Sequence, residues 1–193
     1  MFGKSNKNIV NFAPMNYEIA PLMVRRLPTA DYIARFRDVA RFENLCRVCP
    51  GYGRRWGCPP FADDPQPDLS RWGNVEIWLL RLDIIDPGDA SVDDLYGMLQ
   101  RERGPWERLL LEAEEQRGGR AALFTGMCPH CGDAPCARVS GRPCRHPGLV
   151  RPSLEALGFD LGKTAEELFG LPLKWAADGQ LPDYMTLIGG LFY

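Results

Sequence analysis

The chain has 193 residues, of which 45% are hydrophobic and 25% charged, and its formal net charge at pH 7 is −2. These values are typical of a globular domain and exclude a disordered or collagen-like chain. No apolar run reaches the ~18 residues that a membrane helix needs, the N-terminus has no signal-peptide pattern, and the small net charge argues against nucleic acid as a partner. We therefore expect one domain over residues 1–193, located in the cytoplasm and without membrane contact.

The first predicted element is a weak strand over Tyr17–Arg26, which Pro21 interrupts because proline has no backbone N–H for a sheet ladder. A helix is expected next. It begins at a cap provided by Thr29 or Asp31 and extends to about Phe42, which leads the chain into a cysteine-rich segment.

The hydrophobic pattern of residues 75–125 predicts a strand, a helix and a second strand. Val75–Ile85 is almost continuously apolar, as in a central strand, and Arg120–Thr125 is a shorter apolar run. Between them Ser91 opens a helix, Gly104-Pro105 is expected to break or kink it, and Gly118-Gly119 ends it. This order predicts a βαβ unit with parallel strands whose second strand leads into a cysteine-rich loop.

The C-terminal part predicts a short helix and a final strand. Thr164 and Glu167 form a capping-box pattern for a helix that ends at Gly170, and a turn at Asp178-Gly179 precedes a strand over Asp183–Tyr193. The predicted fold class is α/β, with a small mixed or parallel sheet, a βαβ unit, flanking helices and cysteine-rich loops at strand ends.

All seven cysteines lie in two short windows, residues 46–58 and 128–144. The first window (C-x2-C-x8-C) contains Cys46, Cys49 and Cys58, and the second (C-x2-C-x4-C-x7-C) contains Cys128, Cys131, Cys136 and Cys144. Buried cysteines that serve as small hydrophobic residues are scattered along core elements, whereas these lie among glycines and prolines. Clustered cysteines in a reducing compartment are more often metal ligands than disulfides. The pattern therefore predicts metal sites.

Two kinds of metal site remain open on spacing alone. Zinc is compatible with the C-x2-C turn at Cys128 and Cys131, but a single four-thiolate zinc site leaves three cysteines without a role. Two iron–sulfur sites, with three and four cysteines, use all seven, and proline-stiffened loops can direct backbone amides toward the sulfur atoms. His130 and His146 are the only histidines, and both lie in the second window as alternate ligands or as donors to a ligand.

Arginines surround both windows. We interpret Arg47, Tyr52, Arg54 and Arg55 in the first window, and Arg145 and Arg151 near the second, as candidates to offset cluster charge or to bind a small anion. A short helix beginning near Pro152 or Ser153 would direct its amides toward the same anion.

The segment L-C-R-V-C-P-G-Y-G-R-R-W-G-C-P-P, Leu45 to Pro60, and the later segment P-C-R-H-P-G-L-V-R-P-S-L-E-A resemble a known family. It is a prokaryotic family of predicted metal-binding proteins, the domain-of-unknown-function family numbered 2284, and the resemblance extends over roughly residues 20–190. The resemblance implies a cytoplasmic protein whose seven cysteines bind metal in the form of an iron–sulfur cluster. It implies no particular reaction.

Two functional classes follow from these features. The first is a protein with two [4Fe-4S] clusters, one of which has an iron without a cysteine ligand for a redox, sulfur-transfer or Lewis-acid step; its partner is an electron-transfer protein or a small anionic ligand. The second is a zinc module that stabilises its own loops and docks a partner without catalysis. The sequence does not decide whether the protein is an enzyme.

Overall fold

The computed structural model describes residues 9–12, 14–61, 66, 68–122, 128–132 and 134–193. Six strands form the sheet: β1 (Ile9–Phe12), β2 (Met15–Ile19), β3 (Met23–Pro28), β4 (Asn74–Asp86), β5 (Arg120–Ala122) and β6 (Tyr184–Phe192). Four α-helices flank it: α1 (Thr29–Phe36), α2 (Val39–Arg47), α3 (Val92–Arg117) and α4 (Leu161–Phe169). Single 3-10 turns lie at η1 (Leu69–Arg71) and η2 (Ala137–Ser140).

The sheet order is β1-β2-β4-β6-β5, and β3 pairs with β4 on the same edge as β2. The long strand β4 pairs with β2 through one half and with β3 through the other, and Pro21 lies in the gap between β2 and β3. The predicted strand that proline interrupts is therefore confirmed. Strands β2 and β3 lie along the same edge of β4, and between them Ala20 N–H still donates to the carbonyl of Arg81 at 2.9 Å.

The α/β class is confirmed, and the βαβ unit is present in a split form. Strands β4 and β5 run in the same direction and α3 connects them, but β6 lies between them and is antiparallel to both. The expected parallel pairing is wrong: every strand pair in the described part of the chain is antiparallel. The physical reason is that the C-terminal strand is apolar on both faces, so its lowest free energy is in a central position of the sheet.

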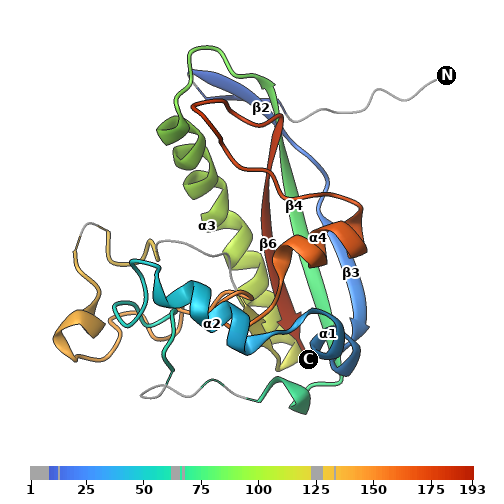
Figure 1. Cartoon of the computed structure of the whole chain (residues 1–193), viewed down its shortest axis with the longest axis vertical. Helices are drawn as coiled ribbons and strands as arrows, with labels where there is room; N and C mark the ends of the chain where they lie inside the picture. The colour runs from blue at the N-terminus through green and yellow to red at the C-terminus, as the bar shows by residue number, and fades with distance from the viewer. Residues whose placement is uncertain (1–8, 13, 62–65, 67, 123–127, 133) are drawn as a thin grey trace.

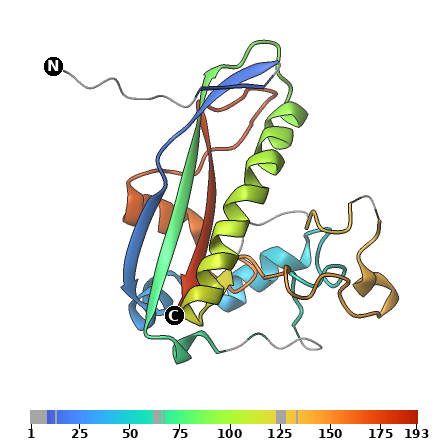
Figure 2. The same ribbon diagram turned by 180° about the vertical axis from the view of Figure 1, so that it is seen from behind.

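Helices cover both faces of the sheet (Figures 1 and 2). On one face α3 packs against Leu82 and Leu187, and on the other α1 and α4 pack against Ile77 and Ile188. Side chains alternate along β4 and β6 between these two cores, as the two-residue period of a strand requires. No helix in the described ranges is long and apolar enough to cross a lipid bilayer.

Helix α3 begins with the predicted capping box between Ser91 and Asp94 and ends at Gly118, whose φ of 65° lies in the left-handed region. The expected break at Gly104-Pro105 does not occur, since α3 continues through Pro105 to Arg117. Proline removes one helical hydrogen bond, but Leu99 and Trp106 on either side are buried in the same core and hold the two halves in line.

The other helices differ from expectation mainly at their ends. The single helix expected up to Phe42 is two helices, because Arg37 adopts an extended conformation and bridges to Phe159, and Asp38 then caps α2. Helix α4 ends at Gly170 as predicted, but its cap is Asp160. Thr164 is buried inside α4 and its hydroxyl lies 3.1 Å from that of Tyr32.

Candidate metal centre

The first cysteine window is a chain of tight turns that starts at the end of α2. Cys46 lies in the last turn of this helix, Cys49 N–H donates to the Cys46 carbonyl at 2.9 Å, and Cys58 N–H donates to the Arg55 carbonyl at 3.1 Å. The window therefore begins at a helix end and not at a strand end. Its turns wind around Gly51, which is buried.

Gly51 leaves a cradle between two thiols. A Cβ atom at this position would lie 3.2 Å from Sγ of Cys58 and 3.7 Å from Sγ of Cys49. Both sulfur atoms thus border the same small space, which even a methyl group would crowd. A side chain here would displace the Cys58 sulfur by a few tenths of an ångström, so glycine keeps the space between the thiols open.

The thiols of the first window are close enough to affect one another's ionisation. Burial raises the pKa of Cys46, and the charges of Cys49, Glu155 and Glu43 raise it further. Burial also raises the pKa of Cys58, with Cys49 and Cys46 adding to the shift and the guanidinium groups of Arg55 and Arg138 opposing it. Like charges at short range favour the neutral thiol unless a cation balances them, which is the condition under which thiolates bind metal.

The second window repeats one local hydrogen bond at two cysteines. The backbone N–H of His146 donates to Sγ of Cys144 at 3.3 Å, and the backbone N–H of His130 donates to the sulfur of Cys128 in the same two-residue relation. The imidazole rings of His130 and His146 lie near each other, with centroids 6.1 Å apart and planes tilted by 52°. Amide donors of this kind stabilise negative charge on sulfur, as the proline-rich loops of the sequence predicted.

Three cysteines of the second window border one cavity. Cys131 and Cys136 line one cavity of about 330 Å³ together with Cys128 and Arg55. Burial raises the pKa of Cys128, its hydrogen bond from His130 and the charge of Arg103 lower it, and Cys131 and Cys144 raise it. The four cysteines of residues 128–144 thus form one neighbourhood, and Arg55 from the first window reaches into it.

The two windows are bound to each other through Arg138. Its guanidinium group donates to the carbonyl oxygens of Arg55 at 2.7 Å and Cys58 at 2.6 Å, and also to that of Pro60. The same group lies over the ring of Trp56, 5.3 Å from its centroid, and the indole N–H of Trp56 donates to the Arg142 carbonyl at 3.1 Å. Figures 1 and 2 show the two loops side by side, away from the sheet.

The predicted anion-binding residues have different environments. Arg47 and the hydroxyl of Tyr52 both contact Glu43, at 3.0 and 3.4 Å, while Arg54 is exposed. Arg145 is exposed and donates to the carbonyl of Pro135 at 3.0 Å. Two of the six candidates line a cavity with a cysteine: Arg55 with Cys128, Cys131 and Cys136, and Arg151 with Cys144.

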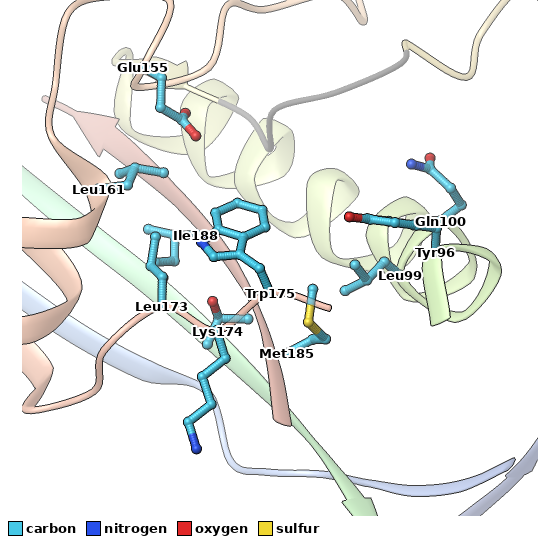
Figure 3. A pocket seen from close by; sticks show the side chains of 11 residues that line it. Tyr96, Leu99, Gln100, Glu155, Leu161, Leu173, Lys174, Trp175, Met185 and Ile188 are labelled. Carbon is cyan, nitrogen blue, oxygen red and sulfur yellow. The ribbon is translucent and has the colours of Figure 1, made fainter. Parts of the chain in front are cut away.

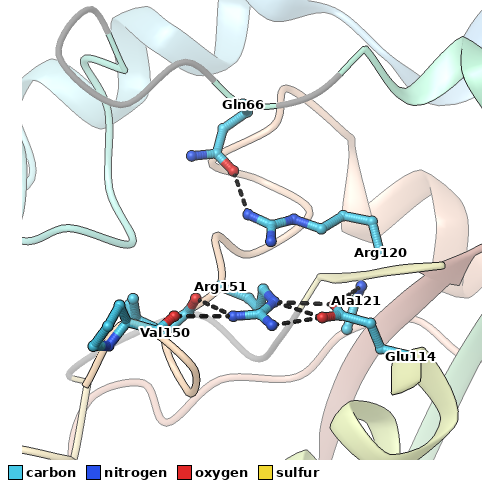
Figure 4. Close-up of polar contacts among 7 residues, drawn as sticks. Gln66, Glu114, Arg120, Ala121, Val150 and Arg151 are labelled. Carbon is cyan, nitrogen blue, oxygen red and sulfur yellow. Dashed lines mark hydrogen bonds and ion pairs between the residues drawn. The ribbon is translucent and has the colours of Figure 1, made fainter. Parts of the chain in front are cut away.

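Arg151 is held by a carboxylate. Both oxygens of Glu114 accept from its guanidinium group at 2.5–3.0 Å, and Glu114 also accepts from Ala121 N–H at 2.5 Å (Figure 4). The two side chains are only 12% and 15% exposed, so Arg151 links the second-window loop to α3. The helix expected after Pro152 is a turn, in which Ser153 Oγ accepts from Ala156 N–H at 3.2 Å.

Two residues of the site were not singled out in the sequence. Arg138 is one of several arginines in its window, and nothing in the spacing distinguishes it from Arg142 or Arg145. Glu155 lies in the R-P-S-L-E-A motif, and burial raises its pKa to about 7, an effect that its own backbone N–H and the Ser153 hydroxyl partly offset. The motif itself was the signal that could have identified Glu155.

The residues present fit a thiolate-bound metal group. All seven cysteines are free thiols, two of them border the Gly51 cradle, and two accept backbone amides in the second window. Among the residues that the structure describes, no three cysteine, histidine or carboxylate side chains converge tightly enough to bind one metal ion. The donor set is therefore one of thiols in two neighbouring groups.

Fold and loops together define a cysteine-rich α/β protein with a paired-loop site suited to soft metals. The family model described as predicted metal-binding protein (DUF2284) matches residues 34–193, and the chain belongs to this family. Comparison with curated proteins and with solved structures found no match. The resemblance noted in the sequence is thus confirmed over most of the chain, together with its expectation of metal binding by a cysteine-rich protein.

Proposed function

We propose that this protein is an iron–sulfur protein with two [4Fe-4S] clusters, one held by Cys128, Cys131, Cys136 and Cys144 and the other by Cys46, Cys49 and Cys58. The observation that carries the proposal is the division of the thiols into two neighbouring groups of four and three, which uses every cysteine. A zinc module would use four of them and leave three without a role.

Bound in this way, the clusters would supply one-electron transfer, and an iron without a cysteine ligand would supply a position for a redox, sulfur-transfer or Lewis-acid step. The protein's part is to hold and balance this charge. Burial raises the pKa of Cys58, and the guanidinium groups of Arg55 and Arg138 oppose that rise by stabilising the thiolate form. The backbone N–H groups of His130 and His146 donate hydrogen bonds to the sulfur atoms of Cys128 and Cys144, and such donors stabilise negative charge on sulfur.

We propose that the ligand or partner binds at the first cysteine window. It contains three cysteines and no histidine, and Cys49 is exposed. Arg54 is exposed beside it and is available to a small anion, whereas Arg47 and Tyr52 reach such an anion only by releasing Glu43. The surface around Cys49 and Arg54 would bind either an electron-transfer protein or a small anionic ligand in the cytoplasm.

Single cysteine substitutions test the assignment. Cys58→Ala and Cys144→Ala, purified without oxygen, should each lose about four irons and four sulfides per chain, because each removes a ligand of one cluster. Cys58→Ala should keep the spectrum of the second-window cluster, and Cys144→Ala that of the first. Unchanged iron in Cys58→Ala would remove the first cluster from the proposal, and stoichiometric zinc without sulfide in the wild type would replace it by a zinc module.

A further inference from the structure

A second site is present on the sheet side of the molecule. A cavity of about 150 Å³ lies beside β6, between α3 and the segment that contains Leu173 and Trp175 (Figure 3). Its walls are aliphatic, formed by Leu99, Leu161, Leu173, Met185 and Ile188. An engineered cavity of about this volume with similar lining is large enough to bind benzene, so a single six-membered ring fits here.

One charged group is directed into this apolar space. Oε2 of Glu155 is buried and has no hydrogen-bond partner among the described residues. Figure 3 shows the Glu155 carboxyl group pointing into the cavity, above the indole ring of Trp175. A buried carboxyl oxygen without a hydrogen-bond partner loses its hydration without compensation, an unfavourable free energy that a bound donor would offset.

The lysine that also lines the cavity does not supply that partner. Nζ of Lys174 lies 2.5 Å from Oδ1 of Asp183 and 4.5 Å from the centroid of the Tyr184 ring. In Figure 3 its ammonium group points away from Glu155. Lys174 therefore does not place its ammonium group near Oε2 of Glu155.

The mouth of the cavity is aromatic and open to solvent. Trp175 is 62% exposed and Tyr96 is 43% exposed, although both contribute to the lining. Exposed aromatic side chains at the rim of an apolar cavity gain contact area when a ring enters it, and their π faces also favour a nearby cation.

We propose that this cavity binds a small apolar amine, with its ring among the aliphatic walls and its ammonium group donating to Oε2 of Glu155. Such a bond is charge-assisted and is one of the stronger hydrogen bonds that a protein makes. The ammonium group would also stabilise the ionised form of the Glu155 carboxyl group, which burial in the cavity disfavours. The proposal does not depend on which metal the cysteines hold.

Three probes that share a phenyl ring test the proposal: benzylamine, benzyl alcohol and benzoate. Each is titrated into the metal-loaded protein by calorimetry, and in a parallel titration the methyl resonance of Met185 is followed by NMR. We expect benzylamine to bind at least about ten times more tightly than benzyl alcohol and to shift the Met185 resonance, and we expect no binding of benzoate. Glu155→Gln should remove the preference for the amine while benzyl alcohol still binds. Glu166→Gln, an exposed neighbour on α4, is the matched control and should keep it.

A second variant keeps the proposal testable if the Glu155→Gln protein does not fold. Trp175→Ala keeps the carboxyl group and changes an exposed side chain, so it should fold and weaken all binding in the cavity. Equal affinity for benzylamine and benzyl alcohol would overturn the proposal, as would a preference for the amine that survives Glu155→Gln. Benzylamine binding that leaves Met185 unshifted would place the amine elsewhere and overturn it as well.

Discussion

The guanidinium group of Arg138, in the second cysteine window, lies 2.6 Å from the carbonyl oxygen of Cys58, in the first. The same side chain donates to two further carbonyls of the first window, those of Arg55 and Pro60. A cation that satisfies three backbone acceptors of a loop with little regular structure fixes that loop's conformation. The conformation of the first window, and of the metal site that we propose there, therefore depends on a residue of the second window.

Arg138→Ala should damage the first site although it leaves all seven cysteines in place. We expect loss of the metal bound at Cys46, Cys49 and Cys58 and a fall in the free energy of unfolding of about 1–3 kcal/mol, because half-buried carbonyls lose a charged donor. Metal analysis and thermal unfolding measure both effects. Arg142→Ala, whose side chain is exposed and bonds only to Ser140 among the described residues, is the control. If Arg138→Ala keeps the metal of both sites, the dependence stated above is wrong.

Gly51→Ala tests the cradle between two thiols. Its Cβ would lie 3.2 Å from Sγ of Cys58 and 3.7 Å from Sγ of Cys49, so we expect the first site to lose metal while the second keeps it. Gly73→Ala adds a methyl group where no atom lies within 4 Å and should change neither site. Full metal occupancy in Gly51→Ala would show that the space between these sulfur atoms is not used.

Several features could be predicted from the sequence because their signals are local. The capping box of Ser91 and Asp94, the interruption at Pro21 and the ends of α3 and α4 at glycines follow from a few neighbouring residues. The spacing of the cysteines likewise identified both windows, and the resemblance of the segments around them indicated the family to which the chain belongs.

Other features depend on contacts between residues far apart in the chain. The insertion of β6 between β4 and β5 is a choice among strand pairings, and an apolar strand gives no indication of its neighbours. Arg138 and Cys58 are 80 residues apart, so no local pattern links them. The continuation of α3 through Pro105 also depends on tertiary packing, which outweighs the intrinsic preference of proline.

The ion pair of Glu114 and Arg151 makes stability depend on pH. Burial raises the pKa of Glu114, but hydrogen bonds from Arg151 and Ala121 outweigh burial and leave the pKa below its usual value. The pair therefore stabilises the fold above the ordinary carboxyl pKa of about 4.3, and this contribution is lost as the pH falls through the lower pKa of the folded state.

Glu114→Gln should lower the free energy of unfolding at pH 7 by about 2–4 kcal/mol, because it leaves a buried guanidinium group without its carboxylate. The difference from the wild type should shrink below pH 4. Denaturant unfolding at a series of pH values measures it, with Glu115→Gln, an exposed neighbour, as the control. A difference that is constant with pH would contradict this account of the pair.

Gly189→Ala tests the packing of α3 on the sheet. A Cβ at Gly189 would lie 2.5 Å from the Trp106 ring and 2.6 Å from the carbonyl oxygen of Ala122, so we expect a loss of about 2–3 kcal/mol in the free energy of unfolding. At Gly190 the nearest atoms are 3.4 Å away, and Gly190→Ala should cost under about 1 kcal/mol. Equal stability of the two variants would mean that α3 does not pack this closely.

The most direct test of the two-cluster assignment is the iron and acid-labile sulfide content of wild-type protein purified without oxygen. Two [4Fe-4S] clusters predict about eight irons and eight sulfides per chain, with Mössbauer spectra that include one iron whose parameters change when a small thiol or anion is added. A colourless protein that holds zinc and no sulfide would contradict the assignment, as would about four irons with all of them insensitive to added ligand.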